Sequence, residues 1–121
     1  MAQKEATFGE PEIAERLRAL PGWYFEEGWI RRVYKTDGWP TTLMLVNAIG
    51  YLSEAAYHHP DLSVTYARVT VKLMTHSAAG ITDKDFALAR QIEDHVLWRP
   101  PAGGALDGTP NKFVRSGDPR G

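Results

Sequence analysis

Two segments of the chain repeat hydrophobic residues with the period of a helix. In the first, which begins at Glu10, Ile13, Leu17 and Leu20 are four and three residues apart and share one face. In the second, residues 41–57, apolar side chains cover most of the helix surface. A helix of this kind is buried on more than one side, so we expect it to contact a sheet on one side and a partner chain on the other.

A third helix is expected after Thr82. This residue is a suitable N-cap and Asp85 follows three residues later, which is close to a capping box. The inward-facing positions of this helix are expected to be Phe86, Ala89, Ile92 and Val96. We expect the helix to end at Trp98, shortly before two prolines that cannot continue it.

Four shorter segments are predicted to be strands because they are rich in aromatic and β-branched residues. They span residues 23–25, 29–35, 62–66 and 69–76, and turn residues separate the two members of each pair. In the last segment Val71 lies between the polar residues Thr70 and Lys72. Because side chains alternate along a strand, this pattern predicts that His76 lies on the same side as Thr70 and Lys72.

The predicted elements follow the order helix, two strands, helix, two strands, helix. Antiparallel hairpins with helices on one face form a two-layer sandwich, so the fold class that we predict is α+β with a four-stranded antiparallel sheet. The chain divides into a loose N-terminus at residues 1–9, one domain at residues 10–98, and an irregular tail at residues 99–121.

At 121 residues and 13.5 kDa the chain has the size of one small domain. Its net charge of −1 gives no excess of positive charge for binding nucleic acid or an anionic membrane. The absence of cysteine excludes disulfides and thiolate metal sites. The first residues lack the apolar run of a signal peptide, and no apolar stretch is long enough to span a bilayer, so we expect a soluble cytoplasmic protein.

Histidines are the most informative residues for function, because there are only four and three of them belong to one group. His58 and His59 are adjacent and precede Pro60, which ends the long helix and holds the two rings in different directions, and His76 follows downstream. Such rings could bond free helix carbonyls. A metal site is disfavoured because adjacent histidines cannot easily bind one ion. Imidazoles could also transfer protons near neutral pH.

Two carboxylates are placed to act on these rings. Glu54 is four residues before His58, so the two can touch on a helix surface, and the carboxylate would hold the ring and raise its basicity. The same two groups could equally form a solvated ion pair, and Asp85 could serve only the start of its own helix. Trp23 and Trp39 are expected in the core or at an interface.

The spacing of these residues resembles the signature of the pterin-4a-carbinolamine dehydratase family. The resemblance extends over residues 20–93 and is more specific than any single histidine. The matching positions are Gly22-Trp23, Glu54, His58-His59-Pro60, Tyr66, Thr75-His76, Gly80-Ile81-Thr82 and Asp85.

The resemblance implies the two-layer fold and a homodimer or tetramer built through the sheet and the long helix. It implies dehydration of 4a-hydroxytetrahydropterin to quinonoid dihydropterin, with no metal and no cofactor. The acid/base and pterin-binding residues that it implies are His58, His59 and His76. The orienting or polarising residues are Glu54 and Asp85, and Trp23 is expected to border the pterin pocket.

Some positions depart from the family pattern. Leu62 stands where the family usually has tryptophan, Ser77 stands where it usually has an acidic residue, and the tail is extra. One group of dehydratase-like proteins, encoded with α-carboxysomes, serves in Rubisco assembly. The alternative function is therefore that of a carboxysome-associated assembly factor whose partner is the Rubisco large subunit, bound by the exposed sheet face and the tail. A third function, coactivation of transcription factors, has no specific support in the sequence.

Overall fold

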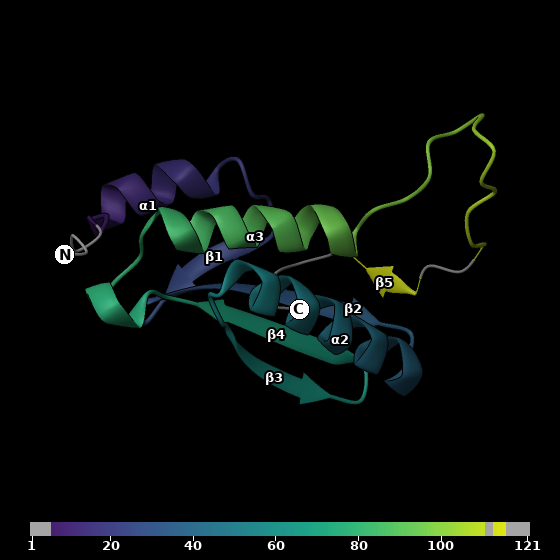
Figure 1. Ribbon diagram of the computed structural model, residues 1–121, viewed down its shortest axis with the longest axis horizontal. Coiled ribbons are helices and arrows are strands. Elements are labelled where there is room, and N and C mark those ends of the chain that lie inside the picture. The colour runs from purple at the N-terminus through teal and green to yellow at the C-terminus, as the bar shows by residue number, and fades with distance from the viewer. Residues whose placement is uncertain (1–5, 111–112, 116–121) are drawn as a thin grey trace.

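The computed structural model describes residues 6–110 and 113–115, which form a two-layer α+β sandwich. The helices are α1 (Glu10–Leu17), α2 (Trp39–Ala56), α3 (Asp83–Val96) and a short 3₁₀ helix, η1 (His76–Ala78). The strands are β1 (Trp23–Glu26), β2 (Trp29–Thr36), β3 (Asp61–Thr65), β4 (Arg68–Leu73) and β5 (Val114–Arg115). The sheet is antiparallel with the order β1-β2-β4-β3, and β5 adds a fifth strand beside β2. The helices lie on one side of it (Figure 1), so the predicted fold class is confirmed.

The core lies between the sheet and the helices. Along β4, Val69, Val71 and Leu73 are fully buried, whereas the residues between them are partly exposed, as the alternation predicts. The four predicted inward positions of α3 are all buried. Because the strand and the helix both turn their apolar sides to one shared space, α3 packs against the sheet along its length.

Helix α2 is apolar on two sides, as the sequence predicts. Leu45 and Ile49 are buried in the core, whereas Met44 and Tyr51 are 62% and 73% exposed. The partner chain that we expect on this exposed side stays a prediction. Among the described residues, no helix combines the length and the apolar character needed to cross a membrane.

Several element boundaries differ by a few residues from the predicted ones, and two of these differences affect the histidines. Helix α2 ends at Ala56 because Tyr57 takes a left-handed conformation, with φ 55° and ψ 43°. Strand β4 ends at Leu73, before the predicted end. The alternation of β4 therefore does not extend to His76, so the prediction that His76 lies on this strand is wrong. His76 nevertheless lies on the predicted side, because it contacts the same indole, Trp29, as Lys72 does. His76 is the first residue of η1.

The segment just before α1 is bound to the domain, although the sequence predicted a loose N-terminus. The Phe8 N–H donates to the Ile81 carbonyl at 2.9 Å, and the rings of Phe8 and Phe86 are 6.0 Å apart. The Arg16 guanidinium lies 4.1 Å from the centroid of the Phe8 ring. Residues 1–5 of the predicted loose segment lie outside the described residues.

The predicted irregular tail, residues 99–121, contains a strand that the sequence did not indicate. Strand β5 pairs with Lys35 and Thr36 at the end of β2. The chain reaches it through a long loop that extends away from the end of α3 (Figure 1). A strand of two residues is too short to show an alternating pattern in the sequence. Residues 111–112 and 116–121 of the predicted tail lie outside the described residues.

A largely buried carboxylate, Glu93 of α3, joins this helix to the sheet. It accepts hydrogen bonds from Trp23 Nε1 at 2.9 Å and from the Tyr34 hydroxyl at 2.6 Å. Arg32 donates to it from Nε at 2.9 Å and from Nη2 at 3.1 Å. The Arg32 guanidinium also covers Gly22, where φ is +95° and an added Cβ atom would lie 2.7 Å from Arg32. Only glycine fits this position without strain.

The cluster changes the proton affinity of both acids in it. Burial acts to raise the pKa of Glu93, but hydrogen bonds from Arg32 and Tyr34 and the charge of Arg32 outweigh it, so this pKa lies below its usual value of 4.5. Burial and the adjacent Glu93 carboxylate raise the pKa of Tyr34 far above its usual value of 10.0. The carboxyl group is therefore charged and the phenol neutral at physiological pH.

We expect Glu93→Ala to lower the free energy of unfolding by about 3–5 kcal/mol, because it leaves the Arg32 charge buried without its partner. Urea unfolding followed by circular dichroism measures this loss. The matched control is Asp94→Ala on the same helix, whose ion pair with Arg90 is largely exposed and contributes at most about 0.5 kcal/mol. Equal losses in the two variants would contradict the stabilising role of the Glu93 cluster.

The effect of Glu93→Ala should also depend on pH. Folding lowers the pKa of Glu93, so the stability that its charge contributes is fully present above about pH 4.5 and is lost as the pH falls through the folded-state pKa. The difference in unfolding free energy between the wild type and Glu93→Ala should therefore shrink when the pH is lowered through this range. A difference that is constant with pH would show that folding does not lower this pKa.

Candidate active site

The end of α2 directs two adjacent histidines to different surroundings. The N–H groups of Tyr57 and His58 bond back to carbonyls of the last helical turn at 3.2 and 3.1 Å, which is the pattern of a Schellman motif. Tyr57 holds its left-handed conformation at a cost of about 1–2 kcal/mol. After this turn the His58 side chain is only 13% exposed, whereas that of His59 is 54% exposed.

Asp85, in the first turn of α3, binds the inner histidine. His58 Nε2 lies 2.7 Å from Asp85 Oδ1. The other oxygen, Oδ2, accepts from the backbone N–H of Thr82 at 2.9 Å and from Thr75 Oγ1 at 2.8 Å. The predicted capping box is present. The fully buried Asp85 carboxylate thus serves the start of α3 and contacts the imidazole at the same time.

The hydrogen bonds around Asp85 determine which groups donate. The Thr82 hydroxyl accepts from the Lys84 N–H at 3.2 Å and lies 2.8 Å from the Thr75 hydroxyl. Since Thr75 Oγ1 donates to Asp85, the Thr82 hydroxyl must donate to Thr75. An ionised Asp85 can only accept, so His58 must donate. The neutral His58 ring therefore carries its proton on Nε2 and has Nδ1 as its acceptor.

The outer histidine contacts the other carboxylate. His59 Nε2 lies 2.8 Å from Glu54 Oε1, and the Glu54 side chain is 79% exposed. The predicted contact between Glu54 and His58 is wrong, because the left-handed turn after Ala56 ends the helical spacing before residue 58 is reached. Each of the two adjacent histidines thus has a carboxylate of its own, one buried and one exposed.

His76 approaches the same region from the loop after β4. A β-bridge between Thr75 and Gly80 closes this loop, and the Thr75 N–H donates to the Gly80 carbonyl at 2.9 Å. The His76 ring lies edge-on to Trp29 of β2, with 5.6 Å between centroids and 77° between planes. Lys72 Nζ lies 4.7 Å from the centroid of the same indole. An aromatic contact therefore orients His76, and a cation lies beside the same aromatic group.

The three histidines line one hollow of about 410 Å³, a size typical of small-molecule sites. The three rings that the family resemblance groups together therefore lie in one concavity, although the chemical role of each stays a prediction. Trp23 lies elsewhere, buried in the Glu93 cluster. His95 lies in the last turn of α3. Within the described parts of the chain, no three His, Asp or Glu side chains are grouped to hold a metal ion.

Known proteins match most of the chain. The family model described as pterin 4 alpha carbinolamine dehydratase matches residues 6–95. A relative from Aquifex aeolicus that is named after this dehydratase is 46% identical over 87 residues, which are 72% of this chain and 88% of that protein. The chain belongs to the pterin-4a-carbinolamine dehydratase family. A relative from Chloroflexus aurantiacus with the same name is 44% identical and covers 70% of this chain and 91% of its own.

A solved structure shares the fold of this dehydratase-family chain. It is the crystal structure of a transcriptional coactivator/pterin dehydratase from Brucella melitensis, with a TM-score of 0.69 and 33% identity over 73% of this chain and 96% of that one. The family match at residues 6–95 includes the three histidines and both carboxylates of the site. The tail that carries β5 lies beyond the part of the chain that matches the dehydratase family.

Three residues in or beside this hollow were not given a role by the sequence. The Thr75 hydroxyl donates a hydrogen bond to Asp85. Lys84 lines the hollow, and its place directly before Asp85 was the available signal. Trp29 was predicted only as a strand residue, and no spacing rule relates it to His76. That contact depends on how β2 and the loop after β4 lie in space.

Asp85→Asn should reverse the tautomer of His58. The Thr82 N–H and the Thr75 hydroxyl both donate to the same carboxylate oxygen, so the amide oxygen of asparagine must stay there and its NH₂ group must face the ring. His58 Nε2 would then have to accept, and the proton would move to Nδ1. Long-range ¹H–¹⁵N correlation spectra of the imidazole measure this change.

The control for this change is Asp83→Asn, on the same turn of α3. The Asp83 carboxylate is 81% exposed and pairs with Arg16, so this variant should keep the His58 proton on Nε2. An Nδ1–H tautomer in the wild type would contradict the direction assigned to the hydrogen bond between His58 and Asp85.

Proposed function

We propose that this protein dehydrates 4a-hydroxytetrahydropterins to quinonoid dihydropterins in the cytoplasm. In this reaction an acid protonates the hydroxyl group on C4a, the C4a–O bond breaks, and water leaves. A base takes the proton of N5, and the electron pair of the N–H bond forms the double bond between N5 and C4a. One proton is given and one is taken, so the reaction requires neither an oxidant nor a reductant.

His58 suits the role of the base. The buried Asp85 holds the ring at Nε2, which leaves Nδ1 as the acceptor for the N5 proton. A carboxylate on the opposite nitrogen orients an imidazole and stabilises the imidazolium that forms when the ring takes a proton, as it does in Ser-His-Asp triads. Asp85 is therefore a positioning residue that acts through His58.

His59 and His76 are suited to act as the general acid and to bind the pterin. Both line the hollow, and they reach it from different elements. The exposed Glu54 holds His59, and Trp29 holds His76. Imidazole is the side chain that most often donates a proton to a leaving group near neutral pH, and a well-placed acid contributes about 10²–10⁴-fold to the rate.

The observation that supports this function most is the convergence of the three histidines on one hollow, with the inner ring bound to a buried carboxylate. Histidines that only bond free helix carbonyls would have no reason to meet a third histidine from another element. A simple surface ion pair would not require a carboxylate that is fully buried and bound by two threonines.

Stopped-flow dehydration of 4a-hydroxytetrahydropterin tests the proposal directly. The wild type should exceed the spontaneous rate, and His76→Ala should lower kcat by about 10²–10⁴-fold, because it removes one proton-transfer partner. The exposed His76 side chain can be removed without unfolding the domain, which thermal unfolding of the variant checks. The matched control is His95→Ala, at an exposed position in the last turn of α3, which should keep the wild-type rate. A wild-type rate equal to the spontaneous one would contradict the proposal.

Rubisco assembly in association with the carboxysome is the alternative that this assay separates from dehydration. It would use the outer face of the sheet and the tail, and the tail lies beyond the family match at residues 6–95. If dehydration proceeds only at the spontaneous rate, the yield of assembled Rubisco large subunit with and without residues 102–121 becomes the measurement that decides.

We also propose a homodimer or tetramer that covers the exposed side of α2. Met44 and Tyr51 are large apolar side chains that are mostly exposed there, and such groups in one patch mark interaction surfaces. Sedimentation velocity at micromolar concentration should give the mass of a dimer or tetramer, and Met44→Lys should lower it. Ala14→Lys, at an exposed position of α1, is the control that should leave the mass unchanged. A monomeric wild type would refute the assembly.

A further inference from the structure

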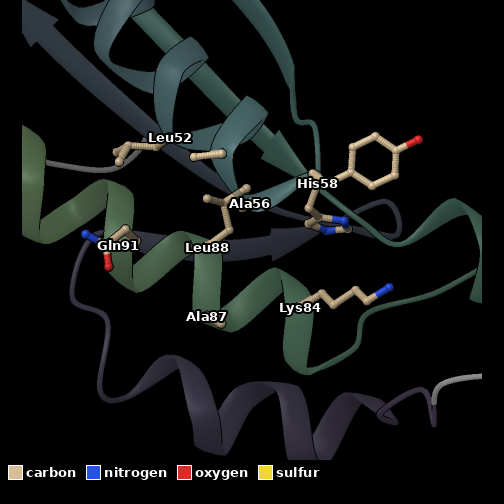
Figure 2. A pocket seen from close by; sticks show the side chains of 9 residues that line it. Leu52, Ala56, His58, Lys84, Ala87, Leu88 and Gln91 are labelled. Carbon is tan, nitrogen blue, oxygen red and sulfur yellow. The ribbon is translucent and has the colours of Figure 1, made fainter.

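An apolar groove of about 570 Å³ runs between α2 and α3 beside the histidine hollow (Figure 2). Leu52, Ala55 and Ala56 line it from α2, and Ala87 and Leu88 line it from α3. The alanines are exposed, whereas Leu88 is buried. Because the side chains that face each other across the groove are small, a space remains between two helices that otherwise pack together.

The groove and the hollow are continuous. Tyr57, His58 and Lys84 line both of them. Figure 2 shows His58 and Lys84 at one end of the groove and Gln91 toward the other end. A molecule whose reacting atoms lie against His58 therefore has an apolar space directly beside those atoms. None of the reaction steps derived above uses this space.

We infer that this groove binds the substituent on C6 of the pterin, and that the preferred substrates carry a bulky apolar or aromatic group at that position. The inference rests on the proposed function, since it takes His58 as the group that contacts N5. In a pterin, C6 is bonded directly to N5. A ring placed with N5 at His58 therefore has its C6 substituent beside the residues that the hollow and the groove share.

The lining indicates the chemistry of the substituent. Leucine and alanine side chains favour a group that removes apolar surface from water. Gln91, toward the far end, offers an amide that can donate and accept hydrogen bonds. A short or strongly charged substituent would leave this apolar space in contact with water. An aryl group attached at C6 matches the apolar lining of the groove.

The test compares substrates that differ only at C6. The 4a-hydroxy derivatives of 6-methyltetrahydropterin and 6-phenyltetrahydropterin are offered to the wild type and to Ala87→Leu, which narrows the groove from α3. We expect the ratio of kcat/KM, phenyl over methyl, to fall by about tenfold or more in Ala87→Leu, as expected when a hydrophobic pocket loses space for its substrate. Ala14→Leu, an exposed alanine of α1, should leave the wild-type ratio unchanged.

Binding of the oxidised analogues gives a readout that needs no turnover. Titrations of 6-phenylpterin and 6-methylpterin, followed by their fluorescence, should show a preference for the phenyl compound in the wild type that Ala87→Leu removes. If neither derivative is dehydrated faster than in the spontaneous reaction, the proposed function fails, and these titrations still decide whether the groove binds the C6 group. Equal phenyl-to-methyl ratios in the wild type and Ala87→Leu would overturn the inference. If the ratios are equal but the sedimentation mass of Ala87→Leu differs from that of the wild type, the groove is instead a contact between copies of the chain.

Discussion

The site depends on one carboxylate, because three separate segments of the chain meet on Asp85. Helix α3 starts there through the Thr82 N–H, the loop after β4 is attached through Thr75, and the end of α2 is attached through His58. The Asp85 carboxylate is fully buried. Removing one of its hydrogen-bond donors would leave the desolvation cost of this carboxylate uncompensated and would destabilise the fold. The positions of the three segments are therefore coupled, and the inner imidazole is oriented by the same carboxylate.

Helix α3 links this site to the rest of the fold. It carries Asp85 in its first turn and Glu93 about two turns later, roughly 12 Å along the helix axis. The first carboxylate binds the loops and the histidine, and the second binds Trp23, Arg32 and Tyr34 of the sheet. The cluster that fixes α3 on the sheet thus also determines where the carboxylate of the site is placed.

The sequence was sufficient for the fold class, because the fold class depends on local periodicity. The alternation of Val69, Val71 and Leu73 identified the buried face of β4, and the spacing of Thr82 and Asp85 identified the start of α3. The sequence could not show which carboxylate contacts which histidine. That assignment depends on a left-handed Tyr57, and a tyrosine gives no sign of a conformation that usually belongs to glycine. Contacts such as Trp29 with His76 or β5 with β2 join distant segments, and no local pattern encodes them.

Strand β5 changes what the sheet offers to other chains. Strand β1 pairs with residues 29–32 of β2 and stops there, so the backbone groups near Lys35 and Thr36 would lack a strand on that side. Strand β5 pairs with them, and the Asp37 N–H donates to the Phe113 carbonyl at 3.0 Å. Unpaired strand edges recruit strands from other molecules and lead to aggregation. The segment beyond the family match therefore covers this part of the sheet edge, and a chain shortened before it would keep its histidines while leaving the backbone groups near Lys35 and Thr36 without a neighbouring strand on that side.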